Sequence, residues 1–215
     1  MKTPRRVRRQ DAGERVAAVV LAGGRGSRMG GKAKILRSLG GLRLIDRAIA
    51  RIAPQVGTVL VSSHLPLGEL RAAGHPILED ALPAHAGPLA GVLSAMEHLL
   101  DGPSPPPWLC SIAADTPWFP MDLVAALQRE SRGKDVVVAA SGGRLHPVFA
   151  LWSLRTASRL RELLVGEGER SVQGVQARLC RAVVDWPVGA TDPFGNLNTL
   201  ADLRRARARL ARERG

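Results

Sequence analysis

Apolar and polar stretches alternate along the chain in a pattern that predicts strands and helices in turn. Short, mostly aliphatic runs predict buried strands over residues 16–21, 58–62, 76–78, 108–113, 135–140, 146–151 and 181–186. Helical spacing of apolar residues and helix-start signals predict helices over residues 42–52, 69–73, 87–100, 121–130, 156–164 and from 198–199 to the Arg-rich end. Apolar strands that alternate with helices favour an α/β fold, with a mainly parallel sheet covered on both faces.

Small or acidic residues follow several of the predicted strands directly. Gly23, Ser62, Asp80 and Asp115 each come just after one of these apolar runs. In a parallel sheet the carboxyl ends of the strands lie along one edge, and ligands bind beyond that edge. The sequence therefore predicts a single binding site to which these four positions contribute.

The loop after the first strand is rich in glycine and in basic residues. Residues 23–34 contain five glycines, two arginines and two lysines. Glycine lets a ligand approach the main chain closely, and successive N–H groups in such a turn bind anions. We therefore expect this loop to hold the phosphates of a nucleotide.

Two common phosphate-binding motifs fit the loop poorly. The glycine spacing does not match the G-x-G-x-x-G pattern of dinucleotide-binding folds. Residues 26–32 match G-x-x-x-x-G-K, but Ala33 follows where a P-loop needs a Mg²⁺-binding Ser or Thr. A tight turn without a ligand would not need four basic residues.

Composition and charge narrow the class of protein. A hydrophobic fraction of 45% supports a full core, no apolar run is long enough to span a membrane, and the two cysteines match no disulfide or zinc framework. Of the net charge of +12, residues 1–15 and 201–215 carry +4 each. We therefore expect a cytoplasmic protein with no nucleic-acid or membrane partner. We also expect a disordered basic lead-in (1–14) and a single domain (15–215) that ends in an Arg-rich helix.

Two further residues are candidates for chemistry. Asp115 follows a predicted strand, where a carboxylate is well placed to hold Mg²⁺ against phosphate oxygens. Its alternative role is to cap the next helix, which the prolines at 117 and 120 make weaker. His146 precedes a proline and by itself is most simply a loop histidine with its hydrogen bonds satisfied.

A set of motifs resembles those of a known family. Residues 21–34 resemble the signature of the molybdenum cofactor guanylyltransferases, members of the nucleotidyltransferase superfamily, through Leu-Ala-Gly-Gly at 21–24, Arg-Met-Gly-Gly at 28–31 and Lys34. Further blocks follow in the family's order: Glu79-Asp80, Gly87-Pro88-Leu89-Ala90-Gly91, Asp115-Thr116-Pro117, Arg144-Leu145-His146-Pro147 and Asp192-Pro193-Phe194-Gly195-Asn196-Leu197-Asn198-Thr199. Together they cover nearly all of residues 16–203.

The resemblance implies a Rossmann-like three-layer α/β/α sandwich that transfers GMP from GTP, with Mg²⁺, to the phosphate of molybdenum-bearing molybdopterin. It also assigns site residues. Those implied for the nucleotide are Leu21, Ala22, Gly23, Gly24, Arg28, Lys34, Ser62, Asp80 and Asp115, with Lys34 and Arg28 on the triphosphate and Asp115 on the metal. Those implied for the acceptor side are His146, Asn196 and Asn198.

Two positions depart from the family pattern. The family commonly has Asp where this chain has Ala33, and often Asn where it has Ser62. These departures leave open a related nucleotidyltransferase that uses CTP or a sugar phosphate. A catalytically silent carrier, which delivers cofactor to apo-enzymes or their chaperones, is a second alternative.

Overall fold

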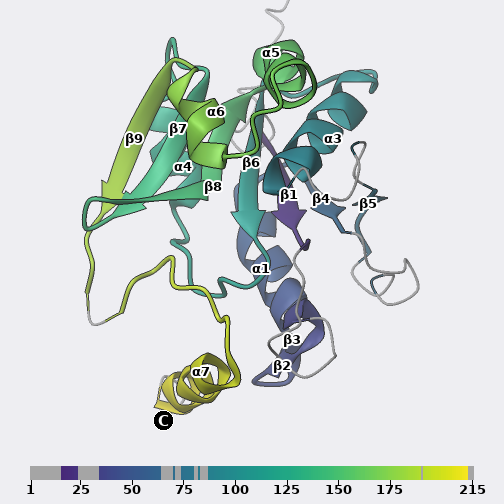
Figure 1. The fold of residues 1–215 in the computed structure, drawn as a ribbon. Coiled ribbons are helices and arrows are strands. Elements are labelled where there is room, and N and C mark those ends of the chain that lie inside the picture. Colours follow the sequence, from purple (N-terminus) through teal and green to yellow (C-terminus); the bar gives the residue numbers. More distant parts are fainter. Residues whose placement is uncertain are drawn as a thin grey trace, which may run out of the picture.

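The computed structural model describes residues 16–23, 34–63, 70, 74–79, 82, 87–189 and 191–212. A seven-stranded sheet runs through the molecule in the order β5-β4-β1-β6-β8-β7-β9 (Figure 1). The strands are β1 (Val16–Leu21), β4 (Thr58–Ser62), β5 (Ile77–Leu78), β6 (Trp108–Ala113), β7 (Val136–Ser141), β8 (Arg144–Ser153) and β9 (Arg181–Trp186). All seven predicted strands are therefore confirmed, with small shifts at their ends.

The sheet is mainly parallel, as predicted, but one strand is reversed. β1 pairs in parallel with β4 and β6, whereas β8 is antiparallel to both β6 and β7. The reversal follows from a two-residue turn between β7 and β8, in which Gly142 and Gly143 have φ of 54° and 77°. Two adjacent glycines with positive φ are typical of tight hairpin turns.

Strand β1 lies at the centre of the fold because its side chains are apolar on both faces. Val16, Ala18 and Val20 pack into one core cluster, and the alternate residues Ala17 and Val19 pack into the other. Every residue of β1 is buried. A strand that is buried on both faces reads as a continuous apolar run, and this is the pattern that identifies it in the sequence.

Helices cover both faces of the sheet and complete the three-layer sandwich. On one face lie α1 (Leu44–Ile52) and α4 (Leu123–Arg129), whose apolar residues belong to the first core cluster. On the other face lie α3 (Pro88–Leu100), α5 (Ala157–Arg161) with its π-helical continuation η7 (Glu162–Gly166), and α6 (Val172–Ala177). Short 3₁₀ turns form η3 (Lys34–Leu36), η4 (Ala53–Gln55) and η6 (Leu154–Thr156).

A smaller layer lies at the end of the sheet to which β1 and β6 point (Figure 1). It consists of the hairpin β2 (Ser38–Leu39) and β3 (Leu42–Arg43) together with α7 (Leu200–Arg212). Leu39, Leu197 and Leu203 form part of a third buried cluster that joins these elements.

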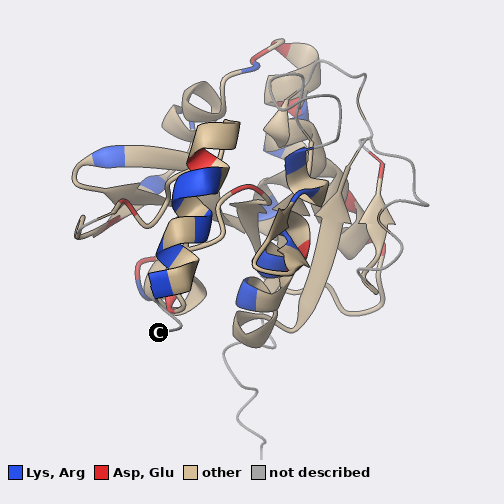
Figure 2. Ribbon diagram, turned by 90° about the horizontal axis from the view of Figure 1, so that it is seen from below, with Lys and Arg blue, Asp and Glu red and all other residues tan. Residues whose placement is uncertain are grey.

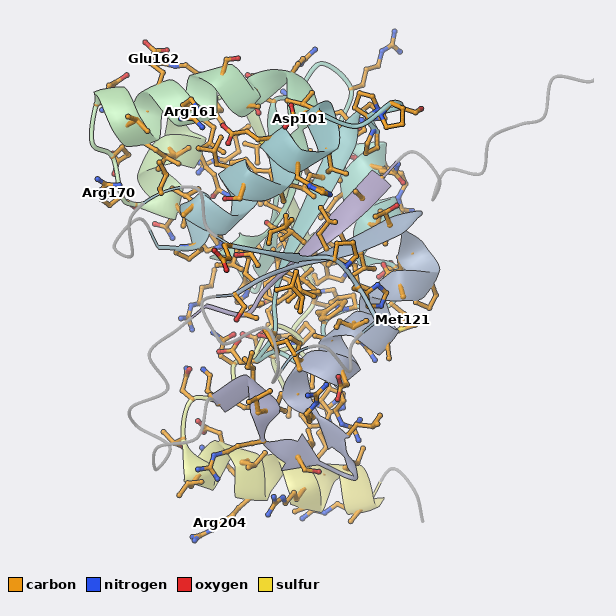
Figure 3. All side chains as sticks on the ribbon, turned by 90° about the vertical axis from the view of Figure 1, so that its right-hand side faces the viewer. Asp101, Met121, Arg161, Glu162, Arg170 and Arg204 are labelled. Carbon is orange, nitrogen blue, oxygen red and sulfur yellow. The ribbon has the colours of Figure 1, made fainter. Side chains whose placement is uncertain are left out.

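Arginines are spaced along α7 (Figure 2), and they differ in whether their side chains contact the rest of the fold. Arg204 points away from the molecule (Figure 3). Arg207 donates a hydrogen bond to the carbonyl of Ser38 at 3.1 Å, and the Arg209 guanidinium lies 4.5 Å from the centre of the Trp118 ring. The Arg-rich helix predicted at the end of the domain is thus partly packed against the fold.

Parts of the prediction need correction, and other parts lie outside the described residues. The helix predicted over 42–52 begins at Leu44, because residues 42–43 pair with β2. Helix α6 was not predicted from the sequence. Of the helix predicted over 69–73, only Leu70 is among the described residues, and the predicted lead-in 1–14 lies outside them. No helix in the described part of the chain has the length and hydropathy to cross a membrane.

Candidate functional site

The carboxyl ends of β4, β1 and β6 are tied together by main-chain hydrogen bonds. The N–H of Ala22 donates to the carbonyl of Ser62 at 2.8 Å, and the N–H of Ala114 donates to the carbonyl of Leu21 at 3.2 Å. The chain then emerges at Gly23, which is exposed. Gly24 and Arg28, predicted to contact the nucleotide, lie outside the described residues, as does Asp80. We define this strand-end region as residues 21–23, 62–63 and 113–116, together with Lys34.

A lysine and a carboxylate, both of them predicted site residues, meet at this edge of the sheet. Lys34 begins η3, Asp115 lies two residues beyond β6, and the Lys34 ammonium forms an ion pair with Asp115 Oδ2. Their side chains are 19% and 15% exposed, respectively, so both remain accessible. The fold therefore brings together two opposite charges that are 81 residues apart in the sequence.

The segment 191–199, which precedes α7, reaches the same point. Lys34 Nζ donates a second hydrogen bond, to Asn198 Oδ1 at 2.8 Å. Thr116 Oγ1 donates to Asn196 Oδ1 at 2.7 Å, and the N–H of Leu197 donates to the Asp115 carbonyl at 3.0 Å. Two amide side chains are thus placed beside the Lys34–Asp115 pair.

Ser62 and Gly91 are packed tightly against each other. Ser62 is 3% exposed, and a Cβ atom on Gly91 would lie 2.3 Å from its Oγ and 2.7 Å from Leu21 Cδ2. Only glycine lets α3 approach β1 and β4 this closely. The predicted contact of Ser62 with a base stays a prediction, whereas its hydroxyl contact with α3 is part of the packing.

His146 lies in a separate cluster rather than beside Lys34. Its Nε2 is 2.6 Å from Ser141 Oγ, and its ring stacks on Phe194 at a centroid distance of 4.7 Å. Burial lowers the pKa of His146 below its ordinary value, and the nearby charge of Asp192 opposes this effect. His146 therefore lies within β8 rather than in a loop, but it is hydrogen-bonded as the sequence favours, and a role on the acceptor side stays a prediction.

Several residues that support the site were not singled out from the sequence. Ser141, Thr116, Asp192 and Phe194 all make side-chain contacts to site residues or to their neighbours. Thr116, Asp192 and Phe194 lie within the family-like motifs, so a signal was present. Ser141 had none, because a serine at the end of an apolar strand is common.

The donors at the site suit a magnesium ion that is shared with a substrate. The described residues contain no group of three or more His, Cys, Asp or Glu side chains that would form a complete metal site. Mg²⁺ usually binds one or two carboxylates together with substrate phosphates and waters. Among the described residues of the strand-end region, Asp115 offers an accessible carboxylate with Lys34 beside it, and this pair fits that arrangement.

Comparisons with known proteins show the family and the fold of the chain. The family model described as "MobA-like NTP transferase domain" matches residues 18–182. The molybdenum cofactor guanylyltransferase of Rhodopseudomonas palustris (strain BisB5) is 41% identical over 191 residues, covering 88% of this chain and 91% of that protein. That of Sinorhizobium fredii is 42% identical over 199 residues, covering 89% and 90%. The crystal structure of molybdopterin-guanine dinucleotide biosynthesis protein A from Archaeoglobus fulgidus has a TM-score of 0.70 at 23% identity, covers 91% of this chain and 99% of its own, and supports the fold.

Proposed function

The chain belongs to the MobA-like NTP transferase family and is a nucleotidyltransferase; from this premise, we propose that it transfers GMP from GTP to the phosphate of molybdenum-bearing molybdopterin. The relatives that cover most of its length are named for that activity, which favours GTP over CTP and molybdopterin over a sugar phosphate. The observation that carries the proposal is the convergence of Lys34, Asp115 and Asn198 at the carboxyl ends of β1 and β6.

The reaction exchanges one phosphoanhydride bond for another. An oxygen of the molybdopterin phosphate attacks the α-phosphorus of GTP, the bond from that phosphorus to the bridging β-oxygen breaks, and pyrophosphate leaves with the electron pair. Such transfers need positioning and charge neutralisation more than covalent help from the protein. The acceptor phosphate is already anionic near neutral pH, so no general base is required.

Lys34 has the charge and the position to act on the triphosphate. Its ammonium has three N–H donors, of which the described contacts use two, on Asp115 and Asn198. In the proposed complex it stabilises the negative charge that builds up on the departing pyrophosphate. Arg28, on the preceding loop, is proposed to help.

Asp115 is the residue that would hold Mg²⁺. The ion, when bound, supplies positive charge to the phosphate oxygens. Before a nucleotide binds, the ion pair with Lys34 keeps the Asp115 carboxylate oriented toward the binding edge, and the Leu197 N–H fixes its main-chain carbonyl. We further propose that Leu21, Ala22, Gly23, Gly24, Ser62 and Asp80 surround the nucleoside, and that Asn196 and Asn198 face the acceptor.

The proposal is tested by separating nucleotide binding from turnover. Thermal unfolding is followed with GTP, CTP or ATP in the presence of Mg²⁺, and pyrophosphate release is then measured after addition of molybdenum-bearing molybdopterin. We expect GTP to stabilise the protein most and release to depend on the acceptor. A preference for CTP would favour the related nucleotidyltransferase, and stabilisation by GTP without release would favour the carrier.

Lys34→Ala provides a sharper test of the geometry. Because Lys34 is proposed to contact the triphosphate, its loss should weaken GTP binding far more than guanosine binding. Arg129→Ala, at the exposed end of α4, is the matched control and should change neither. Equal weakening of GTP and guanosine binding would contradict the role of Lys34.

A further inference from the structure

The segment 191–199 is irregular, yet it carries both asparagines of the candidate site. It connects β9 to α7 and passes along the end of the sheet (Figure 1). Its far end is fixed at Lys34 and Asp115, as described above. Its near end is held by a cluster that consists of Ser141, His146, Asp192 and Phe194, which we call the Ser141 cluster.

A network of hydrogen bonds links the members of the Ser141 cluster. Ser141 Oγ donates to Asp192 Oδ1 at 2.8 Å, and the same carboxylate oxygen accepts the N–H of Phe194 at 2.8 Å. The Phe194 ring, itself 2% exposed, stacks on His146 and lies 5.0 Å from the Phe149 ring. Asp192 therefore joins the end of β7 to the start of the irregular segment.

His146 reaches this cluster because β8 contains a bulge. In the pairing of β7 with β8, Val138 faces Ala150 but the next residue, Ala139, faces His146, so residues 147–149 form an insertion in β8. The carbonyl of Pro147 accepts a hydrogen bond from Gln176 Nε2 at 2.8 Å, and that of Val148 accepts one from Ser111 Oγ at 2.6 Å. Bulges re-aim side chains, and donors from α6 and β6 hold this one in place.

Counting protons fixes the direction of the hydrogen bonds. Ser141 has one hydroxyl proton, and an ionised Asp192 only accepts, so this proton points to Asp192. The 2.6 Å contact to His146 then requires the imidazole to donate from Nε2. His146 thus donates to Ser141, and Ser141 donates in turn to Asp192. We call this chain of two hydrogen bonds, in which each donor is defined, the relay.

We propose that Ser141, His146 and Asp192 are positioning residues for nucleotidyl transfer, which set the path of the segment 191–199 and thereby place Asn198 against Lys34 and Asn196 against Thr116. The expected effect on turnover rests on the proposed function, whereas the expected effect on the conformation of the segment does not. Ser141 ends β7 and His146 lies in β8, Asp192 lies in the segment itself, and the first two residues act on the site only through the segment.

The structural consequence is measured without any substrate. In wild type, the amides of Phe194 and Leu197 are hydrogen-bonded to Asp192 and to the Asp115 carbonyl. In Ser141→Ala and His146→Leu, we expect both amides to exchange with solvent on the order of tenfold faster, while the amides of β1 and β6 keep their protection. Unchanged exchange in the segment would overturn the inference, even if the protein proved to have another activity.

The kinetic consequence is measured by a double-mutant cycle on pyrophosphate release. Ser141→Ala should lower kcat/KM on the order of ten- to a hundredfold, because a small displacement of a positioning group is costly. In a background that lacks both amide side chains, Asn196→Ala with Asn198→Ala, the same substitution should have less than about a twofold effect, since both side chains it places are gone. Equal losses in both backgrounds would show a general effect on stability and overturn the inference.

Two further variants separate positioning from packing. His146→Gln retains an N–H donor and should keep more kcat/KM than His146→Leu, which retains bulk alone. Ser131→Ala removes a hydroxyl that hydrogen-bonds the Gln128 carbonyl at 2.8 Å, far from the segment, and should leave kcat/KM unchanged. If His146→Leu retained as much kcat/KM as His146→Gln, the N–H donor would have no role and the inference would be overturned.

If GTP supported no pyrophosphate release at all, the proposed function would fail. The amide-exchange measurement would still show whether the relay positions the segment.

Discussion

The strand-end region and the segment 191–199 meet at Lys34, but different interactions hold them in place. At the ends of β1, β4 and β6, main-chain hydrogen bonds connect neighbouring strands, and buried side chains cover both faces. The segment has no strand partner, and its contacts are mostly bonds that involve side chains of Thr116, Ser141, Asp192 and Asp202.

This difference suggests how the protein divides two tasks. Charge that must stay in place during the reaction lies on or beside strand ends, where the sheet limits movement. Amide groups that face a larger acceptor lie on a segment whose position depends on several individually weak contacts. The two regions should therefore respond differently to substitution. A substitution in the strand-end region should lower turnover alone, whereas one in the segment should lower both turnover and local stability.

The largest expected effect is on Asp115 in the strand-end region. Asp115→Asn keeps the shape but removes the charge, and we expect kcat for pyrophosphate release to fall by about a thousandfold, in the range found when a transition-state contact is lost. The Tm should stay within about 4 °C of wild type. Asp101→Asn, at the exposed C-terminal end of α3, is the control. Retained turnover in Asp115→Asn would show that the metal and phosphate chemistry lies elsewhere.

The next largest effect is expected at Phe194, the buried anchor of the segment. Phe194 contacts the rings of His146, Phe149 and Trp186, and its truncation to Ala should cost about 3 kcal/mol of unfolding free energy. Urea denaturation measures this loss, and kcat/KM should fall as well. Leu160→Ala, in the opposite core cluster, should cost similar stability but spare kcat/KM. If both variants lost kcat/KM equally, the comparison between the two regions would break down.

A smaller effect is expected where the segment enters α7. Asp202 Oδ2 accepts the N–H groups of Asn198 and Thr199, and Thr199 Oγ1 accepts the N–H of Asp202 in return. This reciprocal cap should make Asp202→Ala about 1 kcal/mol less stable in urea denaturation. Thr199→Ser keeps the hydroxyl and should cost much less. A cost for Thr199→Ser as large as that for Asp202→Ala would argue against the cap.

The smallest effect is a dependence of stability on pH through His146. Burial lowers its pKa in the folded protein, so the unfolded chain takes up this proton at a higher pH than the folded chain does. The contribution of neutral His146 is therefore present above the ordinary pKa of about 6.5 and is lost as pH falls below it. Urea denaturation between pH 8 and pH 5 should show a shallower decline for His146→Gln than for wild type. An identical pH dependence would contradict the buried neutral imidazole.

Much of the strand-end region could be predicted because its signals are local. Continuous apolar runs identify β1, β4 and β6, and residues that directly follow such runs must lie at the edge of the sheet. The same reasoning assigns Gly23 and Asp115 to one site, and the resemblance to the family adds Lys34 at the end of the loop that follows β1. The hairpin at Gly40-Gly41 and the reversal at Gly142-Gly143 had a recognisable signal as well, since paired glycines favour tight turns, but the alternation of strands and helices outweighed it.

The sequence by itself therefore determined the layers, the strands and the chemical character of the site, because hydrophobic periodicity and glycine act over a few neighbouring residues. Only the tertiary structure decided the direction of β8, the insertion at 147–149 that aims His146, and the path that brings Asn198 to Lys34. Each of these depends on contacts between residues far apart in the chain. No local pattern encodes such contacts, because their free energy arises only once the separate elements have packed together.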